Sequence, residues 1–390
     1  MSPGPSDHRV TFALSGYYFA YFAYVGAYSP YFTLYLKDVG MAAAQIGVLY
    51  AIPQVMRIFG PNVWGHVADR SGKPHQVLRA AAFLAFFAFA GIYLGSSFTW
   101  LFLVLLAMHF FTSAQMPLIE AITLDHVRDA PGHYGRIRVW GSVGFILAVL
   151  GVGYLLDTLP VAFVPHVVSG MLLLVVLAAA AMRRPHRVEL PAGRASMREA
   201  LKRPATRAFL IAGALNAFAH AALYTFYSIH LEGHGYSKSA IGWMWAIGVL
   251  IEIAVFQWMP QLTRRIDLGA LYFSTFVVCA IRFLMIAWGV ELWWVLVVAQ
   301  LMHASTFAIF HASAVGLVGR HFGAGNQARG QALFISVTFG FGGFAGGMAS
   351  GALWEAIGPG WTYTLSAAAG ALGALVLLRG GQLGASISRQ

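Results

Sequence analysis

Two acidic residues and two arginines lie in or beside long apolar stretches of the sequence, where charged side chains are rare. Glu252 belongs to the apolar run 240–262 and Arg282 to the run 270–289. If these runs are helices joined near Asp267, each residue lies 15 positions from the turn, about 22 Å along its helix. A carboxylate in the middle of a bilayer is costly unless it faces a partner or a cavity, so it indicates function. We therefore expect Glu252 and Arg282 at one depth, where they can pair, bind an anion or exchange a proton.

A second acid and base have the same relationship. Glu120 lies nine residues before Asp129 and Arg138 nine residues after it, so a hairpin turning there places both about 13 Å deep. In the simplest interpretation, each pair only neutralises its own charge and joins neighbouring helices. A buried ion pair adds little to stability, so its presence needs another reason. The other interpretations are therefore proton coupling, gating and anion recognition.

Polar side chains share helix faces in two further runs. Gln300 and His303 share a face with Phe307, while His311, eight residues after His303, is expected about 80° away from it. In the run 208–231, His220 belongs to a polar and aromatic face.

The ordinary interpretation of a single membrane histidine is a hydrogen bond between helices. His220 and His303 each have polar neighbours on their helix, Tyr224 and Gln300 among them, and this favours a binding site.

Tyrosines recur every three or four residues along the first apolar run, 12–36, and form one stripe. Tyr24 and Tyr28 lie too deep for the membrane surface, so each hydroxyl needs a partner in a medium without water. They either pack against a neighbouring helix or line a cavity. An aromatic cavity that contains an arginine suits an aromatic carboxylate better than a sugar.

The elements that position these residues follow from composition. Hydrophobic residues make up 59% of the chain and charged residues 10%, whereas soluble domains carry about 25% charge. The sequence therefore predicts an all-α membrane protein that spans the lipid bilayer several times. Its first apolar run is too long for a signal peptide and is expected to stay as a span. With one cysteine, Cys279, no disulfide framework is expected, and the spacing of the other residues indicates no metal site and no cofactor.

We predict twelve transmembrane helices of roughly 20 residues each. They cover residues 12–36, 46–67, 77–95, 99–124, 138–157, 161–182, 208–231, 240–262, 270–289, 292–318, 331–354 and 360–378. The loop 183–207 contains three prolines and eight Lys or Arg residues, and we interpret it as a cytoplasmic linker without regular structure. It separates an N-terminal six-helix half, residues 1–182, from a C-terminal half, residues 208–390.

The two halves repeat at a distance of 195 residues, which is half of 390. This shift carries Gly40 onto Gly235 and Ala51 onto Ala246, and it carries Arg57 onto Glu252. We therefore expect two copies of one unit, with a buried base in one copy where the other has a buried acid.

The placement of Lys and Arg predicts the topology. Of the 25 such residues, Lys37 and Lys238 fall in loops on one side, and Arg57 and Arg282 lie within spans. The others lie on the side of the N-terminal tail or at span ends facing it. This positive-inside pattern predicts cytoplasmic N- and C-termini, in a multi-pass protein of the bacterial inner membrane. The net charge of +11 is thereby explained without a nucleic-acid partner.

One short motif follows the second span. Gly65, Asp69, Arg70, Gly72 and Lys73 resemble the signature that the major facilitator superfamily carries between its second and third spans. The resemblance implies a gate motif at the cytoplasmic surface, with the acid capping or contacting a helix N-terminus. Pro74 stands where the family usually has a second base. The superfamily fold has two six-helix halves with a binding site between them at mid-membrane.

The residues around the charged pairs are similar to the lactose permease group of that superfamily. There, the acid and arginine matching Glu120 and Arg138 contact the substrate. Glu252, Arg282 and His303 resemble the same group's proton and sugar network.

Two departures limit this resemblance. Thr306 stands where that group has its proton-carrying glutamate, and Gln300 where it has a lysine. The chain is more similar to the phenylpropionate permease family, through the segments 219–224, 235–237 and 300–303, with Phe307.

The resemblance implies a secondary active transporter rather than an enzyme. We expect a monomer that couples protons to the symport of a small aromatic carboxylate by alternating access. Proton coupling is expected at Glu252, His303 and Glu120. The expected substrate-binding residues are Tyr24, Tyr28, Arg57, Glu120, Arg138, His220, Tyr224, Arg282, Gln300 and His303.

Three alternatives remain open. An exporter or exchanger of the same fold shares every motif above. A proton symporter for a neutral nucleoside, sugar or drug-like solute is the second. A membrane enzyme or receptor is the third, but the sequence has no reactive constellation to support it.

Overall fold

The computed structural model describes the chain except residues 1–4, 129–131, 183–196, 324–325 and 381–390. Every regular element among the described residues is a helix. By packing, the chain divides into two units: Met1–Leu190 with Tyr236–Ala246, and Pro191–Gly235 with Ile247–Gln390. The division of the sequence into halves at residues 182 and 208 stays a prediction.

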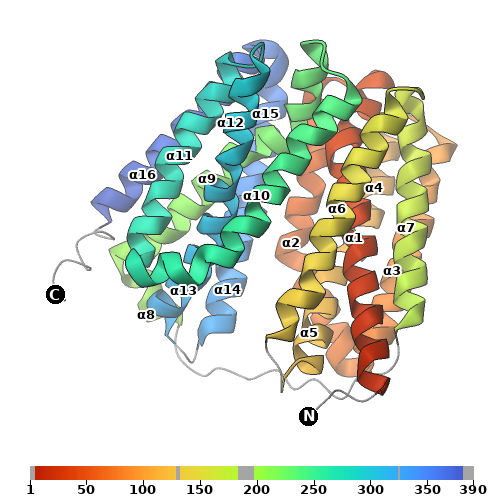
Figure 1. Cartoon of the computed structure of the whole chain (residues 1–390), viewed down its shortest axis with the longest axis horizontal. Coiled ribbons are helices and arrows are strands. Elements are labelled where there is room, and N and C mark those ends of the chain that lie inside the picture. The colour runs from red at the N-terminus through yellow and green to blue at the C-terminus, as the bar shows by residue number, and fades with distance from the viewer. Residues whose placement is uncertain (1–4, 129–131, 183–196, 324–325, 381–390) are drawn as a thin grey trace. The chain divides into compact units, whose positions relative to one another are not determined.

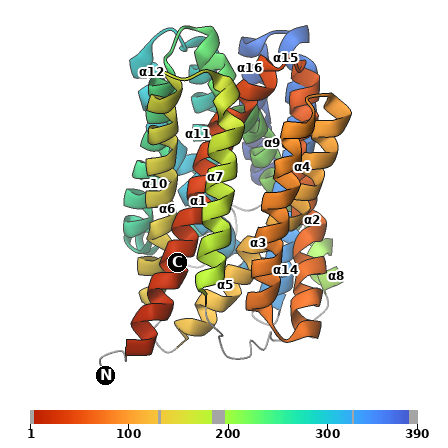
Figure 2. The ribbon, with the colours of Figure 1, turned by 90° about the vertical axis from the view of Figure 1, so that its right-hand side faces the viewer.

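In the first unit, α1 runs alongside α6 and α7, and α3 packs on α4 and α7 (Figures 1 and 2). Its helices are α1 (Pro5–Asp38), α2 (Ala43–Ser71), α3 (Pro74–Ala90), α4 (Phe98–Thr112), α5 (Gln115–His126), α6 (His133–Leu156) and α7 (Val164–Ala181), with short 3₁₀ turns at Gly91–Leu94 and Val161–Phe163. The first turns of α10 also pack in this unit.

In the second unit, α9 packs on α15 and α16, and α11 packs on α16 (Figure 1). Two π-helical segments, η3 and η5, interrupt otherwise α-helical spans. The elements are α8 (Met197–Lys202), α9 (Pro204–Gly233), α10 (Lys238–Arg265), α11 (Leu268–Trp288), α12 (Trp293–Leu301), η3 (Ser305–Ile309), α13 (Phe310–Phe322), α14 (Gln327–Ile335), η5 (Ser336–Gly342), α15 (Gly343–Ala356) and α16 (Pro359–Arg379).

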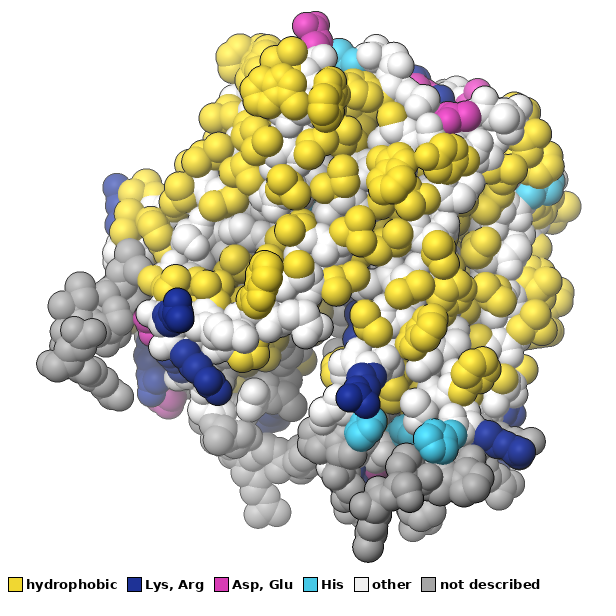
Figure 3. Space-filling model, viewed as in Figure 1, with side chains coloured by type: hydrophobic (Ala, Val, Ile, Leu, Met, Phe, Trp, Pro, Cys, Tyr) yellow, Lys and Arg dark blue, Asp and Glu magenta, His cyan; other side chains and the backbone are white. Residues whose placement is uncertain are grey.

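The predicted twelve-helix membrane architecture is confirmed. Ten described helical segments are long and apolar enough to cross a bilayer, with α4–α5, α12–α13 and α14–α15 each forming one crossing. The first two predicted spans, 12–36 and 46–67, correspond to α1 and α2, which contain the tyrosine stripe and polar residues such as Arg57. On the visible face of each unit, hydrophobic side chains cover the middle of the helices, and most Lys and Arg side chains gather toward one end (Figure 3).

The half-chain repeat is reproduced in the backbone. Gly40 and Gly235 both have positive φ, 83° and 81°, a conformation that glycine adopts without steric penalty. The helices before them end at Asp38 and Gly233, and the helices after them begin at Ala43 and Lys238. Each of these pairs is separated by the predicted 195 residues.

Two local predictions were wrong. The motif 65–73 is mostly helical, because α2 continues to Ser71 and ends only at Gly72, whose φ is +60°. The linker contains the helix α8, and α9 already begins at Pro204, where a proline is favourable as a first helical residue. Residues 183–196 of the linker lie outside the described residues.

The start of α10 is held tightly against α6 within the first unit. Asp157, at the end of α6, accepts hydrogen bonds from the backbone N–H groups of Lys238 (2.7 Å) and Ser239 (3.2 Å). A Cβ atom built on Gly153 would lie 2.7 Å from the carbonyl oxygen of Lys238, and one on Gly242 would lie 2.8 Å from that of Val149. The two helices therefore touch through glycines, next to a carboxylate that caps α10.

Candidate functional site

The second unit contains a buried set of polar side chains from four helical spans, which we call the polar network. Glu252 comes from α10 and Arg282 from α11. His220 comes from α9. The span formed by α12, η3 and α13 supplies the rest: Gln300, His303 and Thr306.

Glu252 pairs with His303. The Nε2 atom of His303 lies 2.6 Å from Oε1 of Glu252, and the two side chains are 9% and 13% exposed. A carboxylate only accepts hydrogen bonds, so with Glu252 ionised Nε2 carries the hydrogen. The Nδ1 atom of His303 is buried and has no hydrogen-bond partner among the described residues. This ring nitrogen is therefore positioned to accept a proton.

Arg282 is fully buried and donates to four acceptors. Nε donates to the Ala299 carbonyl oxygen (2.8 Å), NH2 to Oε1 of Gln300 (3.3 Å), and NH1 to Oγ1 of Thr306 (3.0 Å) and Nε2 of His220 (3.3 Å). The pairing of Arg282 with Glu252 that the equal depth allowed is not formed as a hydrogen-bonded ion pair, and the Glu252 carboxylate acts on Arg282 only through space. Counting residues from a turn fixes the depth of a side chain, but not its direction around the helix, and Arg282 points toward α12 and η3.

His220 is a neutral acceptor toward Arg282. Its Nδ1 lies 2.8 Å from the carbonyl oxygen of Asn216, which only accepts, so the ring hydrogen is on Nδ1. Nε2 then presents its lone pair to Arg282 and to Thr306 Oγ1, 3.1 Å away. All four partners of Arg282 are therefore neutral, and no carboxylate of the described residues lies within hydrogen-bonding distance of it.

Aromatic rings surround the polar network. Phe283 packs edge-on against His220 at 5.1 Å and lies 5.6 Å from Arg282 Cζ, while Tyr224 lies 6.3 Å from His220. Phe307 stacks on His303 at 5.5 Å.

The His303 stack continues along the same span. The Phe307 ring also stacks on His311, at 6.5 Å. Side chains four residues apart are neighbours on a helix, so this contact joins His311 to Phe307 and leaves the predicted angle between His311 and His303 as a prediction.

In the first unit, the predicted pairing of Glu120 with Arg138 is confirmed. Arg138 Nε lies 3.4 Å from Glu120 Oε1, and the side chains are 32% and 28% exposed. The hydroxyl of Tyr134, which the sequence did not single out, donates to Glu120 Oε2 at 2.6 Å. The guanidinium of Arg138 also lies 4.4 Å from the ring centre of Phe22 and 5.2 Å from that of Tyr18.

The deep tyrosines of α1 have the partners that their depth requires. Tyr28 OH lies 3.1 Å from Nε2 of His109, and Tyr24 OH lies 3.9 Å from the sulfur of Met108. Arg57 is on α2 in the same unit with an exposed side chain, so the expectation of a buried base at this position is wrong. The roles of these residues, and of the motif residues in α2, stay predictions.

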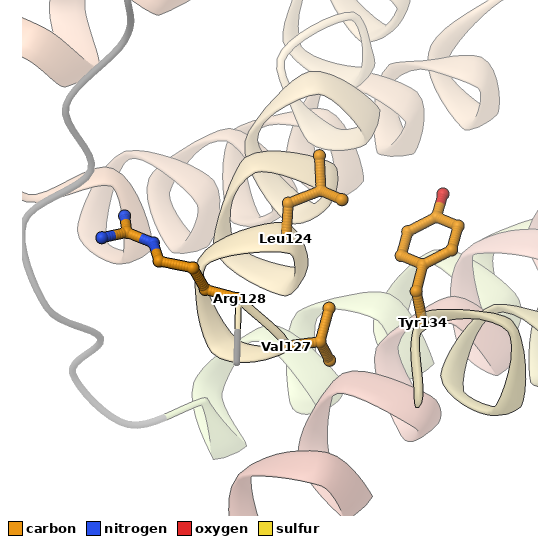
Figure 4. Close-up of a pocket in the computed structure, with 4 residues that line it drawn as sticks. All are labelled: Leu124, Val127, Arg128 and Tyr134. Atoms are coloured by element: carbon orange, nitrogen blue, oxygen red, sulfur yellow. The ribbon is translucent and has the colours of Figure 1, made fainter. Parts of the chain in front are cut away.

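A cavity of about 270 Å³ lies at the turn between α5 and α6, lined by Leu124, Val127, Arg128 and Tyr134 (Figure 4). The Arg128 side chain extends away from the Tyr134 ring. The cavity contains none of the residues expected to bind substrate. We therefore take the polar network as the candidate site for substrate and proton binding. The described residues also include no cluster of three His, Cys, Asp or Glu side chains that could hold a metal.

Comparison with known proteins identifies the family. The model of the MFS_1 like family, part of the major facilitator superfamily, matches residues 11–365. The chain belongs to this family. It is a multi-pass membrane transporter, and its relatives are transporters rather than enzymes.

Two relatives and one solved structure show the range of the family. A protein of Escherichia coli (strain K12) named "Probable 3-phenylpropionic acid transporter" is 28% identical over 337 residues, covering 83% of this chain and 86% of that protein. The maltose permease of Geobacillus stearothermophilus is 36% identical over 188 residues, 47% of this chain and 45% of the permease. The crystal structure of the nucleoside transporter NupG superposes with a TM-score of 0.81 at 18% identity, over 95% of this chain and 98% of that one. The last likeness concerns the fold alone.

Proposed function

We propose that this transporter carries a small aromatic carboxylate in symport with protons. The observation that supports the proposal most strongly is the state of Arg282. It is a fully buried guanidinium whose four hydrogen-bond acceptors are all neutral. A charge removed from water is expensive unless it is paired, and an anionic ligand is one way to supply the pair.

The surroundings of Arg282 favour an aromatic anion. Gln300 is 3% exposed, and its Nε2 donor has no hydrogen-bond partner among the described residues. Phe283, Tyr224 and Phe307 add aromatic faces around the same network. A carboxylate bound at Arg282 and Gln300 would form charge-assisted hydrogen bonds, while its ring packs on these faces. The name of the E. coli relative agrees with this substrate class.

The pair Glu252–His303 supplies a path for the proton. A proton that adds to the free Nδ1 of His303 converts the imidazole to an imidazolium, whose positive charge the Glu252 carboxylate stabilises across 2.6 Å. Loss of the same proton toward the other membrane face restores the neutral ring. We assign Glu252 and His303 to proton coupling on this basis, and Glu120 to the substrate path through its pair with Arg138.

The proposal includes the predicted orientation, with both termini in the cytoplasm of a bacterium and the chain in its inner membrane. A reporter fused at either terminus, active only in the cytoplasm, tests this part separately.

The deciding experiment is uptake into proteoliposomes that contain the purified full-length protein. Labelled 3-phenylpropionate should accumulate when the outside is more acidic than the inside, and the external medium should become more alkaline as it enters. Unlabelled aromatic acids should compete, whereas uridine, maltose and 3-phenylpropionamide should not. Transport of one of the neutral solutes in place of the acid contradicts the proposal. Accumulation of 3-phenylpropionate when the inside is more acidic than the outside identifies an exporter.

A further inference from the structure

Thr306 is the side chain of the polar network in closest contact with the terminal nitrogen atoms of Arg282. It lies in the π-helical segment η3 and is 1% exposed. Its Oγ1 accepts from NH1 of Arg282 at 3.0 Å, lies 3.1 Å from Nε2 of His220, and lies 3.3 Å from the carbonyl oxygen of His303. The hydroxyl is therefore held at one point, between a cation and a neutral histidine.

The residue type at position 306 decides whether the side chain next to NH1 of Arg282 carries a charge. Threonine gives Arg282 a neutral oxygen as hydrogen-bond acceptor. None of the hydrogen-bond partners of the guanidinium is then a carboxylate. A carboxylate attached at position 306 would start from the same backbone and lie within reach of NH1. It would form a charge-assisted hydrogen bond with Arg282 and neutralise it.

The other groups of the network supply no carboxylate hydrogen bond to Arg282. His220 is fixed as a neutral acceptor by the Asn216 carbonyl, and Gln300 has no charge. Glu252 forms its hydrogen bond with His303 and acts on Arg282 only through space. Position 306 is consequently a place at which one substitution puts a carboxylate next to NH1 of Arg282, in exchange for a hydroxyl that also contacts His220.

We propose that Thr306 determines the charge of the solute that the transporter accepts. With threonine, the guanidinium has no carboxylate among its hydrogen-bond partners and selects an anion, and with an acid at this position the site selects a neutral solute. The inference rests on the proposed function, because it takes Arg282 as the group that meets the substrate carboxylate.

The test uses the full-length protein and the three variants Thr306→Glu, Thr306→Gln and Thr306→Val. Glutamine has the size of glutamate without its charge, and valine has the shape of threonine without its hydroxyl. The dissociation constants of 3-phenylpropionate and of its neutral amide, 3-phenylpropionamide, are measured by titration calorimetry for each protein. The quantity compared is the ratio of the two constants.

We expect Thr306→Glu to weaken binding of the acid by at least about tenfold relative to Thr306→Gln, and to shift the acid-to-amide ratio by a similar factor toward the amide. Thr306→Gln and Thr306→Val should keep the preference for the acid even where both affinities fall. Equal ratios in Thr306→Glu and Thr306→Gln overturn the proposal, because size alone would then explain the effect.

A second measurement separates this inference from the proposed function. Without any ligand, the thermal stability of Thr306→Glu should exceed that of Thr306→Gln, because the carboxylate compensates Arg282. If the wild-type protein binds neither probe, the substrate assignment fails, and this comparison still decides whether position 306 controls the charge at Arg282. A Thr306→Glu protein that is less stable than Thr306→Gln, or does not fold while Thr306→Gln does, contradicts the inference.

Discussion

Glu252 and His303 are joined by a contact of 2.6 Å between the carboxylate and Nε2, which leaves the other ring nitrogen of His303 as an unpartnered buried site. The acid in the middle of α10 therefore faces a ring that can gain and lose a proton. In the function we propose, the two tasks of a symporter are thereby divided between different side chains of one network: the proton goes to Glu252 and His303, and the substrate to Arg282.

Glu252→Gln should uncouple substrate movement from proton movement. Glutamine can still accept the hydrogen bond from His303, but it has no charge to stabilise an imidazolium. We expect gradient-driven accumulation of 3-phenylpropionate and the associated alkalinisation to fall by at least about tenfold, while exchange of labelled for unlabelled substrate persists. Glu291→Gln, an exposed acid in the turn between α11 and α12, is the matched control and should leave both intact. Alkalinisation that survives in Glu252→Gln would remove Glu252 from the proton path.

Arg282→Lys should be nearly as damaging as removal of the side chain. Nε, NH1 and NH2 donate in different directions, and a single ammonium cannot reach the Ala299 carbonyl, Gln300 and Thr306 together. The affinity for 3-phenylpropionate should fall by at least about tenfold, as expected when hydrogen bonds to a charged group are lost. Binding measured by calorimetry, with the exposed Arg128→Lys as control, checks this. An affinity unchanged in Arg282→Lys would show that the charge alone, and not the guanidinium geometry, binds the carboxylate.

The sequence predicts most of this architecture because its signals are local and periodic. The apolar runs place the spans, and the repeat of 195 residues predicts the two glycines with positive φ, Gly40 and Gly235. The pairing of Glu120 with Arg138 also follows from counting, since both side chains lie near the turn that joins their helices.

Counting failed deeper in the membrane. Residue numbers give the depth of Arg282 but not the direction of its side chain, so Glu252 was expected to be its partner instead of Thr306. The π-helical turn at Ser305–Ile309 shifts the helix face and has no signature in the hydrophobic pattern. The substitution of the usual acid by Thr306 was visible in the sequence, but its consequence required the geometry of Arg282.

The contact between α6 and α10 makes a paired prediction for two glycines of one helix. A Cβ atom on Gly153 would lie 2.7 Å from the carbonyl oxygen of Lys238 in α10, whereas one on Gly151 would meet nothing within 4 Å. Gly153→Ala should therefore lower the thermal stability, by roughly 1–3 kcal/mol as for overpacking elsewhere. Gly151→Ala should leave stability unchanged or raise it slightly, because alanine is the better helix former. Thermal unfolding of both variants in one detergent decides the point, and equal stabilities would show that the two helices can separate freely there.

Asp157 makes the stability of the contact between α6 and α10 depend on pH, because its carboxylate accepts hydrogen bonds from the start of α10. Its slight burial raises the pKa of the carboxyl, but the hydrogen bonds from Ser239 and from the Lys238 backbone, with the charge of Lys238, outweigh this and lower it below the ordinary value. A carboxyl whose pKa is lower in the folded state stabilises the fold above its unfolded pKa, and this contribution is lost as the pH falls through the folded pKa. The stability of the wild type should thus decline below about pH 4, near the ordinary aspartate pKa, as the cap on α10 is protonated.

In Asp157→Asn this part of the decline should be absent, because an amide accepts one hydrogen bond at every pH but carries no charge to interact with the helix N-terminus. Thermal unfolding from pH 7 to pH 3 measures the difference between the two proteins, and Asp38→Asn, at the exposed end of α1, should follow the wild-type curve. Parallel curves for the wild type and Asp157→Asn would mean that the carboxylate does not hold the start of α10 in place.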